Sequence, residues 1–332
     1  MTTLVPNAAS AATPTGSRRP GTVAAHSVDR FVFSVPDLAV ANQFYTTFGL
    51  DVRQDGDRLD LFTHGNPHCW ASIFRAGERK QLQFVRYGIF AGDEAVFRER
   101  IAQADIAIAP HPLATGIGGD VGLWLRNPDG IAIQLVVAHK VSPSAPTVTV
   151  VPPAVPPGHG AAPSRSKVKP VRPRNLSHIL MYTPDVPRMS TFCQAVLGLR
   201  MSDYTADVIA FMHTPHGSDH HLVAFAKSHA PGLHHSSWDV GNADEVGSGM
   251  EQMRNAGWGK GWGVGRHVLG SNFFNYVEDP WGSFCEYSAG IDFIPADLDW
   301  PAADHPPEDS LYVWGPAVPE NFITNQEQPL PG

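Results

Sequence analysis

The sequence repeats itself on either side of a proline-rich stretch. Residues 30–50 (RFVFSVPDLAVANQFYTTFGL) and residues 178–199 (HILMYTPDVPRMSTFCQAVLGL) each combine an alternating strand pattern, a Pro-Asp turn, an amphipathic helix pattern and a closing Gly-Leu. Residues 125–136 likewise match residues 277–288, where a proline-containing turn leads into a final strand. Two copies of one module at similar spacing indicate an internal duplication, which constrains the fold more than any local pattern does.

Within each copy, a strand and a helix are followed by several strands, and this order then recurs. The second helices are expected at residues 95–106 and 245–257, where apolar residues fall at steps of three and four. The sequence therefore predicts an α+β fold of two tandem modules, each made of two βαβββ units that curl a sheet around a cavity. We place the first module at residues 25–140, the second at 174–292, and a lid-like extension over the second at 293–332.

The remaining segments are short and of simple composition. Residues 1–24 are rich in Ala, Thr, Pro and Gly and lack the apolar core of a signal peptide, so we expect a disordered tail. Residues 141–173 contain repeated prolines, which predict a semi-rigid linker. Its basic end would suit either an anion site or a solvated linker, and the composition favours the linker.

Composition excludes several classes of partner. Of the 332 residues, 42% are hydrophobic and 17% charged, which is ample for a sizeable core. The formal net charge of -8 argues against nucleic acid, and no apolar run is long enough to span a membrane. Three cysteines without CxxC spacing favour neither a disulfide framework nor a zinc knuckle, so we expect a reduced, cytoplasmic protein.

Three candidate metal ligands fall on strands of the second module. His178 lies on its first strand, His235 on the strand that opens its second half, and Glu286 on its last strand. Side chains of matched parity on neighbouring strands point to one face, so these three are expected to meet in the cavity. Two imidazoles and one carboxylate on one side of a metal are typical of non-haem Fe(II) sites that bind substrate and O2 together, and Mn(II) accepts the same ligands.

The duplication supplies an internal comparison for this triad. The first module has Arg30, Phe84 and Gln134 at the positions that correspond to the three ligands. All three ligand types are therefore missing together from the first copy, although drift alone would also produce this. We expect the first module to be a structural copy without metal.

Three motifs follow one another in the second module: DHHLVAF, GLHHSSWDV and GRHVLGSNFFNYVEDPWGSFCEY. With these motifs the chain resembles the type I extradiol ring-cleaving dioxygenases of the vicinal oxygen chelate superfamily, and the resemblance extends over nearly all of residues 26–315. It implies a metal triad of His178, His235 and Glu286. It also implies three further site residues that contact substrate or O2: His221, His267 and Tyr276.

The resemblance implies cleavage of a catecholic ring by O2 outside its two hydroxyls, in the degradation of aromatic compounds. Tyr276 and His267 are of suitable type to hydrogen-bond the deprotonated substrate oxygen, and His221 to stabilise charge near O2 and deliver a proton. The expected partners are a small aromatic diol and O2. Because these folds often assemble, we also expect a homo-oligomer.

Two departures from the family pattern bear on the substrate. Relatives that act on homoprotocatechuate carry polar residues where this sequence has Leu180 and Trp262. An apolar pocket disfavours an unpaired carboxylate, so a neutral, apolar-substituted catechol is expected. The alternatives on the same fold are cleavage of hydroquinone-type rings and an O2-independent isomerase or epimerase, whereas a metal-free binding protein has no reason to keep the triad.

Two of the predicted site histidines have a histidine as their direct neighbour in the sequence. Spacing and alignment select His221 over His220 and His235 over His234. The remaining candidates, His213, His216 and His229, are interpreted as solvated loop residues. Cys285 should point away from the metal face, because it adjoins Glu286 on the same strand, and is expected to pack in the core.

Overall fold

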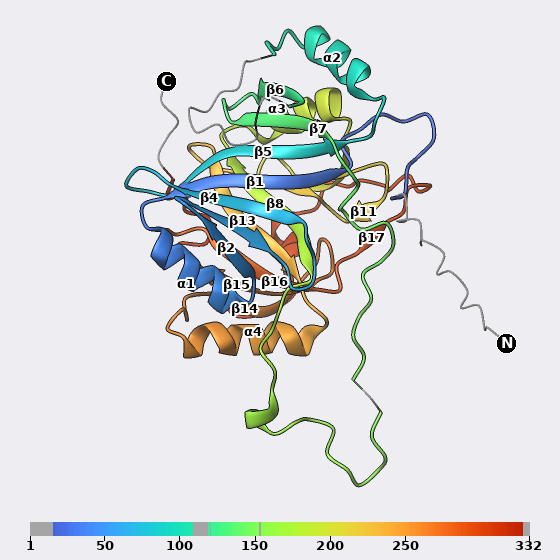
Figure 1. Cartoon of the computed structure of the whole chain (residues 1–332). Coiled ribbons are helices and arrows are strands. Elements are labelled where there is room, and N and C mark those ends of the chain that lie inside the picture. The colour runs from blue at the N-terminus through green and yellow to red at the C-terminus, as the bar shows by residue number, and fades with distance from the viewer. Residues whose placement is uncertain (1–15, 109–118, 120, 153, 328–332) are drawn as a thin grey trace, which may run out of the picture.

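The computed structural model describes residues 16–108, 119, 121–152 and 154–327, and contains one curled sheet for each copy of the module (Figure 1). The first copy forms a seven-stranded sheet in the order β2-β3-β4-β1-β5-β7-β6. Its strands are β1 (Ser27–Val35), β2 (Asp51–Asp55), β3 (Arg58–Phe62), β4 (Cys69–Arg75), β5 (Gln81–Ile89), β6 (Leu123–Arg126) and β7 (Ala132–Val137). The helices of this copy are α1 (Leu38–Phe48) and α2 (Glu94–Gln103).

The second copy forms a nine-stranded sheet in the order β18-β14-β15-β16-β13-β8-β12-β10-β9, beside a small β11-β17 pair. Its strands are β8 (Asn175–Thr183), β9 (Arg200–Thr205), β10 (Ile209–His213), β11 (Ser218–Asp219), β12 (Val223–Lys227), β13 (Gly232–Asp239), β14 (Gly261–His267), β15 (Phe273–Glu278), β16 (Phe284–Ala289), β17 (Phe293–Ile294) and β18 (Tyr312–Trp314). Its helical segments are α3 (Val186–Phe192), the π-helical turn η2 (Cys193–Leu197), α4 (Ala243–Asn255) and α5 (Pro307–Ser310); a 3-10 turn, η1 (Arg165–Lys167), lies in the linker. The predicted α+β fold of two tandem modules is confirmed.

The repeated Pro-Asp and Gly-Leu pairs mark helix ends. The carboxylate of Asp37 accepts hydrogen bonds from the backbone N–H groups of Ala39 and Val40 and so caps α1. Asp185 caps α3 in the same way through the N–H of Arg188. Gly49 ends α1 in the left-handed region, at a φ of 101°, where a side chain would be strained. In the second copy, Gly198 ends η2, which directly follows α3, in the same left-handed region at a φ of 71°. The same local chemistry therefore begins and ends the first helical segment of both copies.

Strand register supports the equivalence between the copies. In the second copy, His178 on β8 lies opposite Ser237 on β13, which lies opposite Glu286 on β16. In the first copy, Arg30 on β1 lies opposite Arg86 on β5, which lies opposite Gln134 on β7. The ladder that carries two metal ligands in one copy therefore carries Arg and Gln in the other. The second unit of the first copy has three strands in the described part, namely β5, β6 and β7. Residues 109–118 and 120, between α2 and β6, are outside that part.

The two copies share one core. The rings of Phe48 on α1 and Tyr287 on β16 stack with centroids 3.9 Å apart, and the Tyr287 hydroxyl donates to the carbonyl of Phe48 at 2.8 Å. Phe44 packs edge-on against Trp258, which follows α4. Helix α1 consequently lies beside α4 of the other copy (Figure 1). One continuous cluster of buried apolar side chains therefore spans both modules.

The predicted boundary of the N-terminal tail is wrong. Ser17 donates to the carbonyl of His216 at 2.5 Å, Arg18 pairs with Asp93 at 2.6 Å, and Ala24 is fully buried. Residues 16–24 therefore pack between the copies. The simple composition of the segment gave no sign of these contacts, because their partners lie far away in the sequence. Residues 1–15 are outside the described part of the chain.

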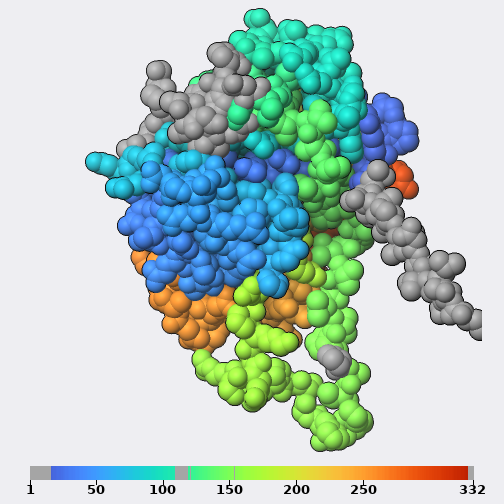
Figure 2. Space-filling view, in the orientation of Figure 1, coloured from blue at the N-terminus to red at the C-terminus, as the bar shows by residue number. Residues whose placement is uncertain are grey.

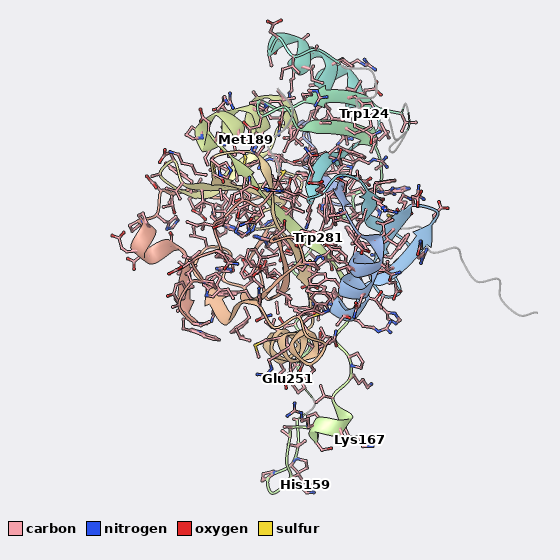
Figure 3. All side chains as sticks on the ribbon, turned by 90° about the vertical axis from the view of Figure 1, so that its left-hand side faces the viewer. Trp124, His159, Lys167, Met189, Glu251 and Trp281 are labelled. Atoms are coloured by element: carbon pink, nitrogen blue, oxygen red, sulfur yellow. The ribbon has the colours of Figure 1, made fainter. Side chains whose placement is uncertain are left out.

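The linker leaves the body of the molecule and returns to it. Its two ends are anchored, since the Ser142 hydroxyl donates to the carbonyl of His26 and Val171 is buried. Val150 is still bonded to the backbone of Gly241, and beyond it the chain projects away from the body of the molecule (Figure 2), with His159 and Lys167 far from the core (Figure 3). At its basic end, Arg165 pairs with Glu251 at 2.6 Å. Among the described residues, no helix has the length and apolarity needed to cross a membrane.

Candidate metal centre

The three predicted ligands meet on the concave face of the nine-stranded sheet. Nε2 of His178 lies 3.2 Å from Nε2 of His235 and 3.4 Å from Oε2 of Glu286, and His235 Nε2 lies 3.6 Å from the same carboxylate oxygen. A metal with bonds of about 2.1 Å to three ligands at right angles separates those ligand atoms by about 3 Å. All three side chains are buried, and the residues fit a facial metal site.

The hydrogen bonds of His178 fix which of its ring nitrogens faces this site. The Ser177 hydroxyl donates to Asp219 Oδ2 at 2.8 Å, and the hydroxyl oxygen of Ser177 lies 3.2 Å from His178 Nδ1. Because its proton is engaged by Asp219, the hydroxyl accepts from Nδ1–H of His178. The Nε2 lone pair of His178 is therefore left for a metal.

His235 has a comparable support. Its Nδ1 lies 2.7 Å from Nδ1 of His234, which also has a hydrogen bond to the backbone of Phe322. Burial lowers the pKa of His234 to about 4, so that ring is neutral. A neutral His234 that donates to the Phe322 carbonyl accepts at Nδ1, and His235 then presents an unprotonated Nε2.

Glu286 completes the site with one free oxygen. Its Oε1 accepts from Nδ2 of Asn272 at 3.0 Å, whereas Oε2 is buried without a hydrogen-bond partner and faces the two imidazoles. Burial opposes ionisation of this carboxyl, but the adjacent His178, followed by His267, outweighs that effect and lowers the pKa. An ionised, orphaned oxygen beside two imidazole lone pairs is costly unless a cation binds there.

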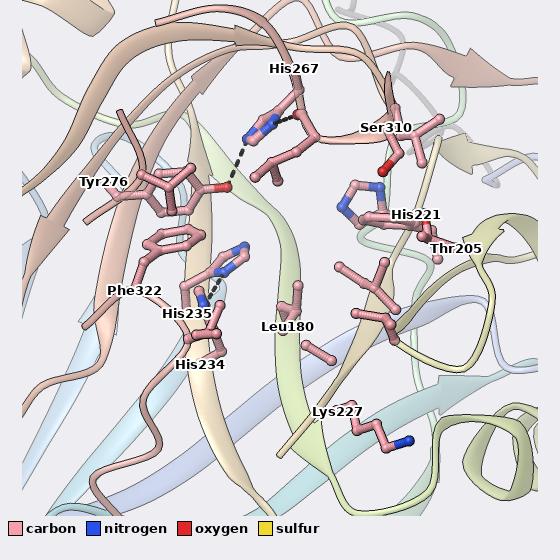
Figure 4. Close-up of a pocket in the computed structure, with 18 of the residues that line it drawn as sticks. Leu180, Thr205, His221, Lys227, His234, His235, His267, Tyr276, Ser310 and Phe322 are labelled. Atoms are coloured by element: carbon pink, nitrogen blue, oxygen red, sulfur yellow. Dashed lines mark hydrogen bonds between the residues drawn. The ribbon is translucent and has the colours of Figure 1, made fainter. Parts of the chain in front are cut away.

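A cavity of about 260 Å³ opens from the metal face. Its polar lining includes histidines 178, 221, 235 and 267 and Tyr276. The rest is largely apolar and is lined by residues that include Leu180, Val208, Ile209, Phe211, Ala226, Leu269, Leu311, Val318, Phe322 and Ile323. Figure 4 shows His267 and Tyr276 on one side of the cavity and His221 on the other. Part of the C-terminal extension thus covers the site.

Tyr276 and His267 form a directed pair. Nδ1 of His267 lies 2.7 Å from the carbonyl of Leu311, so it carries the proton, and Nε2 is free to accept. The Tyr276 hydroxyl lies 2.9 Å from that Nε2 and donates to it. Burial lowers the pKa of His267 and raises that of Tyr276 well above its usual value, so both groups are neutral. The phenolic oxygen keeps its lone pairs available to a bound hydroxyl.

His221 lies on the wall of the cavity opposite His267 and Tyr276. Its ring centroid lies 3.9 Å from that of His178 and 4.9 Å from that of Phe211. Burial, followed by the charge of His178, lowers its pKa well below the usual value for histidine. His221 lines the cavity, whereas its neighbour His220 points away from it, as the spacing predicted.

Some sequence interpretations of other residues were wrong. The interpretation of His213 and His216 as solvated is wrong, because both are buried, while His229 is exposed as expected. Trp262 is not among the residues that line the cavity; it stacks behind Tyr276 at 5.6 Å. Leu180 lines the cavity, and Cys285 packs in the core, both as expected.

Sequence reasoning missed the residues that support the ligands. Ser177 and Asp219 sit behind His178, and Asn272 behind Glu286. Ser177 directly precedes a ligand, which is a signal that could have been used. Asp219 and Asn272 carry no local signal, because their roles depend on strands that meet only in the folded chain.

Comparison with known proteins first defines the class. The model of the glyoxalase, bleomycin resistance protein and dioxygenase superfamily matches residues 175–287. Homoprotocatechuate 2,3-dioxygenase from Arthrobacter globiformis superposes with a TM-score of 0.72 at 19% identity, over 95% of this chain and 96% of that one. The Mn(II)-bound glyoxalase from Novosphingobium aromaticivorans gives 0.70 at 24% identity, over 90% and 94%. These likenesses establish the fold and leave the chemistry open.

A closer relative narrows the class to a family. Metapyrocatechase 2 of Cupriavidus necator is 48% identical over 304 residues, which cover 92% of this chain and 93% of that protein. The chain belongs to the extradiol ring-cleaving dioxygenases of the vicinal oxygen chelate superfamily.

Proposed function

We propose that this protein cleaves a neutral, apolar-substituted catechol with O2 at a non-haem Fe(II) held by His178, His235 and Glu286. The observation that carries the proposal is the meeting of three buried ligand atoms, two of whose residues, His178 and His235, line a largely apolar cavity. Family membership supports the reaction, and the cavity lining supports the substrate class. Fe(II) bound there would hold the two vicinal oxygens of the diol together with O2 and pass electron density between them.

The substrate enters with its ring against the apolar wall and its hydroxyls toward the ligands. Tyr276 accepts a hydrogen bond from one hydroxyl while its own proton is held by His267. This contact orients the ring and assists removal of the hydroxyl proton. His221 faces the diol from the other side of the cavity and takes up and returns a proton during ring opening.

The lining also disfavours charged substituents. Leu180, Leu269 and Phe322 line the cavity together with His178 and His235. Lys227 also lines the cavity but pairs with Asp207, so it is not a free counter-ion for a substrate carboxylate. Burial of a neutral polar group without partners costs roughly 2–7 kcal/mol, and burial of an unpaired carboxylate costs more. An alkyl or aryl substituent fits this environment better.

The test is O2 uptake by the Fe(II)-loaded protein with a panel of diols. Catechol, 3-methylcatechol, 2,3-dihydroxybiphenyl, homoprotocatechuate and hydroquinone are offered in parallel while visible absorbance is recorded. We expect one O2 consumed per neutral catechol, with a yellow ring-opened product and a much lower kcat/KM for homoprotocatechuate. Uptake with hydroquinone alone, or with none of the diols, would refute the proposal. The homo-oligomeric state stays a prediction.

A further inference from the structure

His221 is backed by hydrogen bonds that lead away from the cavity. Its Nδ1 lies 3.1 Å from Nδ1 of His220, and Nε2 of His220 lies 2.8 Å from Oδ2 of Asp203 on β9. All three side chains are buried. The metal ligands have their own supports in Ser177, His234 and Asn272, so Asp203 and His220 serve neither the ligands nor the cavity wall.

Asp203 is held as an ionised acceptor. Its carboxylate also receives the backbone N–H of Ala303 at 3.1 Å, the indole N–H of Trp300 at 3.2 Å and Nε2 of His305 at 2.9 Å. Burial opposes ionisation, but the hydrogen bonds from His220 and His305 outweigh it and lower the pKa of Asp203. The C-terminal extension therefore supplies three of the four donors.

An ionised carboxylate sets the order of protons along this line. A carboxylate can only accept, so Nε2 of His220 carries a proton. In neutral His220, Nδ1 is then a lone pair, and Nδ1 of His221 must donate to it. His221 is left with an unprotonated Nε2, and its ring lines the cavity (Figure 4).

We propose that Asp203 and His220 are positioning residues that fix the tautomer of His221, so that a nitrogen lone pair faces the substrate. This inference rests on the proposed function. When His221 takes a substrate proton at Nε2, its Nδ1 proton passes to Nδ1 of His220. The positive charge then lies beside the Asp203 carboxylate and away from the metal, and no proton is gained or lost overall.

The tautomer can be measured without turnover. Long-range ¹H–¹⁵N spectra of the zinc-loaded protein, which is diamagnetic, report which nitrogen of each histidine is protonated, and His221→Phe assigns the signal. We expect an unprotonated Nε2 in the wild type. In Asp203→Asn a single amide oxygen replaces two acceptors, so the Nε2 signal of His221 shifts toward the protonated form. An unchanged signal overturns the proposal.

A double-mutant cycle tests whether Asp203 acts through His221. Asp203→Asn should lower kcat about 10- to 100-fold, with KM and iron content unchanged. The same substitution in the His221→Phe background should cause no further loss, because the residue it positions is absent. The proposal is overturned if the kcat losses of Asp203→Asn and His221→Phe multiply in the double variant. It is also overturned if Asp203→Asn keeps the wild-type kcat, or if it changes only KM or iron content.

Asp299→Asn is the matched control. Asp299 is an exposed carboxylate that ties the same extension to β9 through Arg200, without contact to His220. It should retain the wild-type kcat and tautomer; a loss equal to that of Asp203→Asn would assign the effect to a loosened extension and overturn the proposal. If the wild type cleaves no catechol, the proposed function fails, while the spectra still report the tautomer.

Discussion

At the scale of single residues, hydrogen-bond direction decides what each histidine in this site can do. Ser177 and His234 each engage Nδ1 of a ligand and leave Nε2 for the metal. Leu311 engages Nδ1 of His267 and leaves Nε2 for Tyr276. The same residue type thus serves as ligand or as hydrogen-bond acceptor because of its neighbour, and not because of its place in a motif.

Glu286→Gln should abolish stoichiometric metal binding. The amide keeps the shape of the side chain and its packing, but it removes the negative charge that balances a cation beside His178 and His235. We expect the iron content per chain to fall by more than about tenfold, since even substitutions outside the ligand set cost about 10- to 100-fold. Elemental analysis after Fe(II) loading measures this. The exposed His229→Ala variant should keep its iron, and stoichiometric iron in Glu286→Gln would refute the triad.

The triad could be predicted from sequence, because it depends on strand parity and on comparison of two copies of one module. The burial of His213 and His216 could not. His213 ends β10 against Ser202, and His216 receives the backbone N–H of Arg19 from the N-terminal segment. These environments form only when distant segments meet, so a local polar pattern gave the wrong interpretation. The role of Asp203 could not be predicted for the same reason.

At the scale of elements, the C-terminal extension is part of the site. Phe322 is buried, and its ring lies 4.8 Å from that of His234 and 4.9 Å from that of Tyr276. Strand β18 continues the large sheet beside β14. The extension therefore closes the cavity and also holds His267, through the carbonyl of Leu311.

Phe322→Ala should weaken substrate binding. Loss of the ring removes apolar contact at the cavity wall, and full burial of such a side chain contributes about 1.5–3 kcal/mol. With about 1.4 kcal/mol per tenfold change, we expect KM for a substituted catechol to rise about tenfold or more. Steady-state kinetics measure this. The exposed Val313→Ala variant on β18 serves as the control, and an unchanged KM in Phe322→Ala would show that the extension does not contact substrate.

The packing of α1 against the second module should govern stability. Phe48→Ala removes the ring stacked on Tyr287 and leaves a void between the modules. Such buried truncations cost about 3–5 kcal/mol, so the urea midpoint should fall markedly. The exposed Val148→Ala in the linker should leave the midpoint unchanged. Equal midpoints for the two variants would mean that the modules do not depend on this contact.

At the scale of the whole molecule, the duplication produces one working module and one supporting module. The sequence predicted the α+β modules and the loss of ligands from the first copy. It did not predict that helices of one copy pack on the other, or that residues 16–24 dock between them. Hydrophobic periodicity shows which face of an element is buried, but not which distant element covers it.

Buried neutral histidines should make the fold sensitive to acid. Burial lowers the pKa of His213 to about 3 and that of His216 to about 4, below the usual 6.5. The unfolded chain therefore takes up protons on these two histidines below pH 6.5 that the folded chain does not bind, so their contribution to the free energy of unfolding falls as pH drops from about 6.5 to about 4. Urea midpoints at pH 7 and pH 5 measure this loss.

His216→Gln is the variant that isolates one contribution to this loss. Glutamine keeps a polar side chain but takes up no proton, so the difference in urea midpoint between pH 7 and pH 5 should be smaller than in the wild type. The exposed His229→Gln should leave that difference unchanged. A wild-type pH dependence in His216→Gln would contradict the assignment.

The most direct test of the central claim is ring cleavage under ¹⁸O2. The Fe(II)-loaded protein is given 3-methylcatechol or 2,3-dihydroxybiphenyl, and the product is trapped and analysed by mass spectrometry. We predict a ring-opened product that incorporates oxygen from ¹⁸O2, with the broken carbon–carbon bond outside the two hydroxyls. A product that contains no ¹⁸O, or one opened between the hydroxyls, would contradict extradiol cleavage at this site.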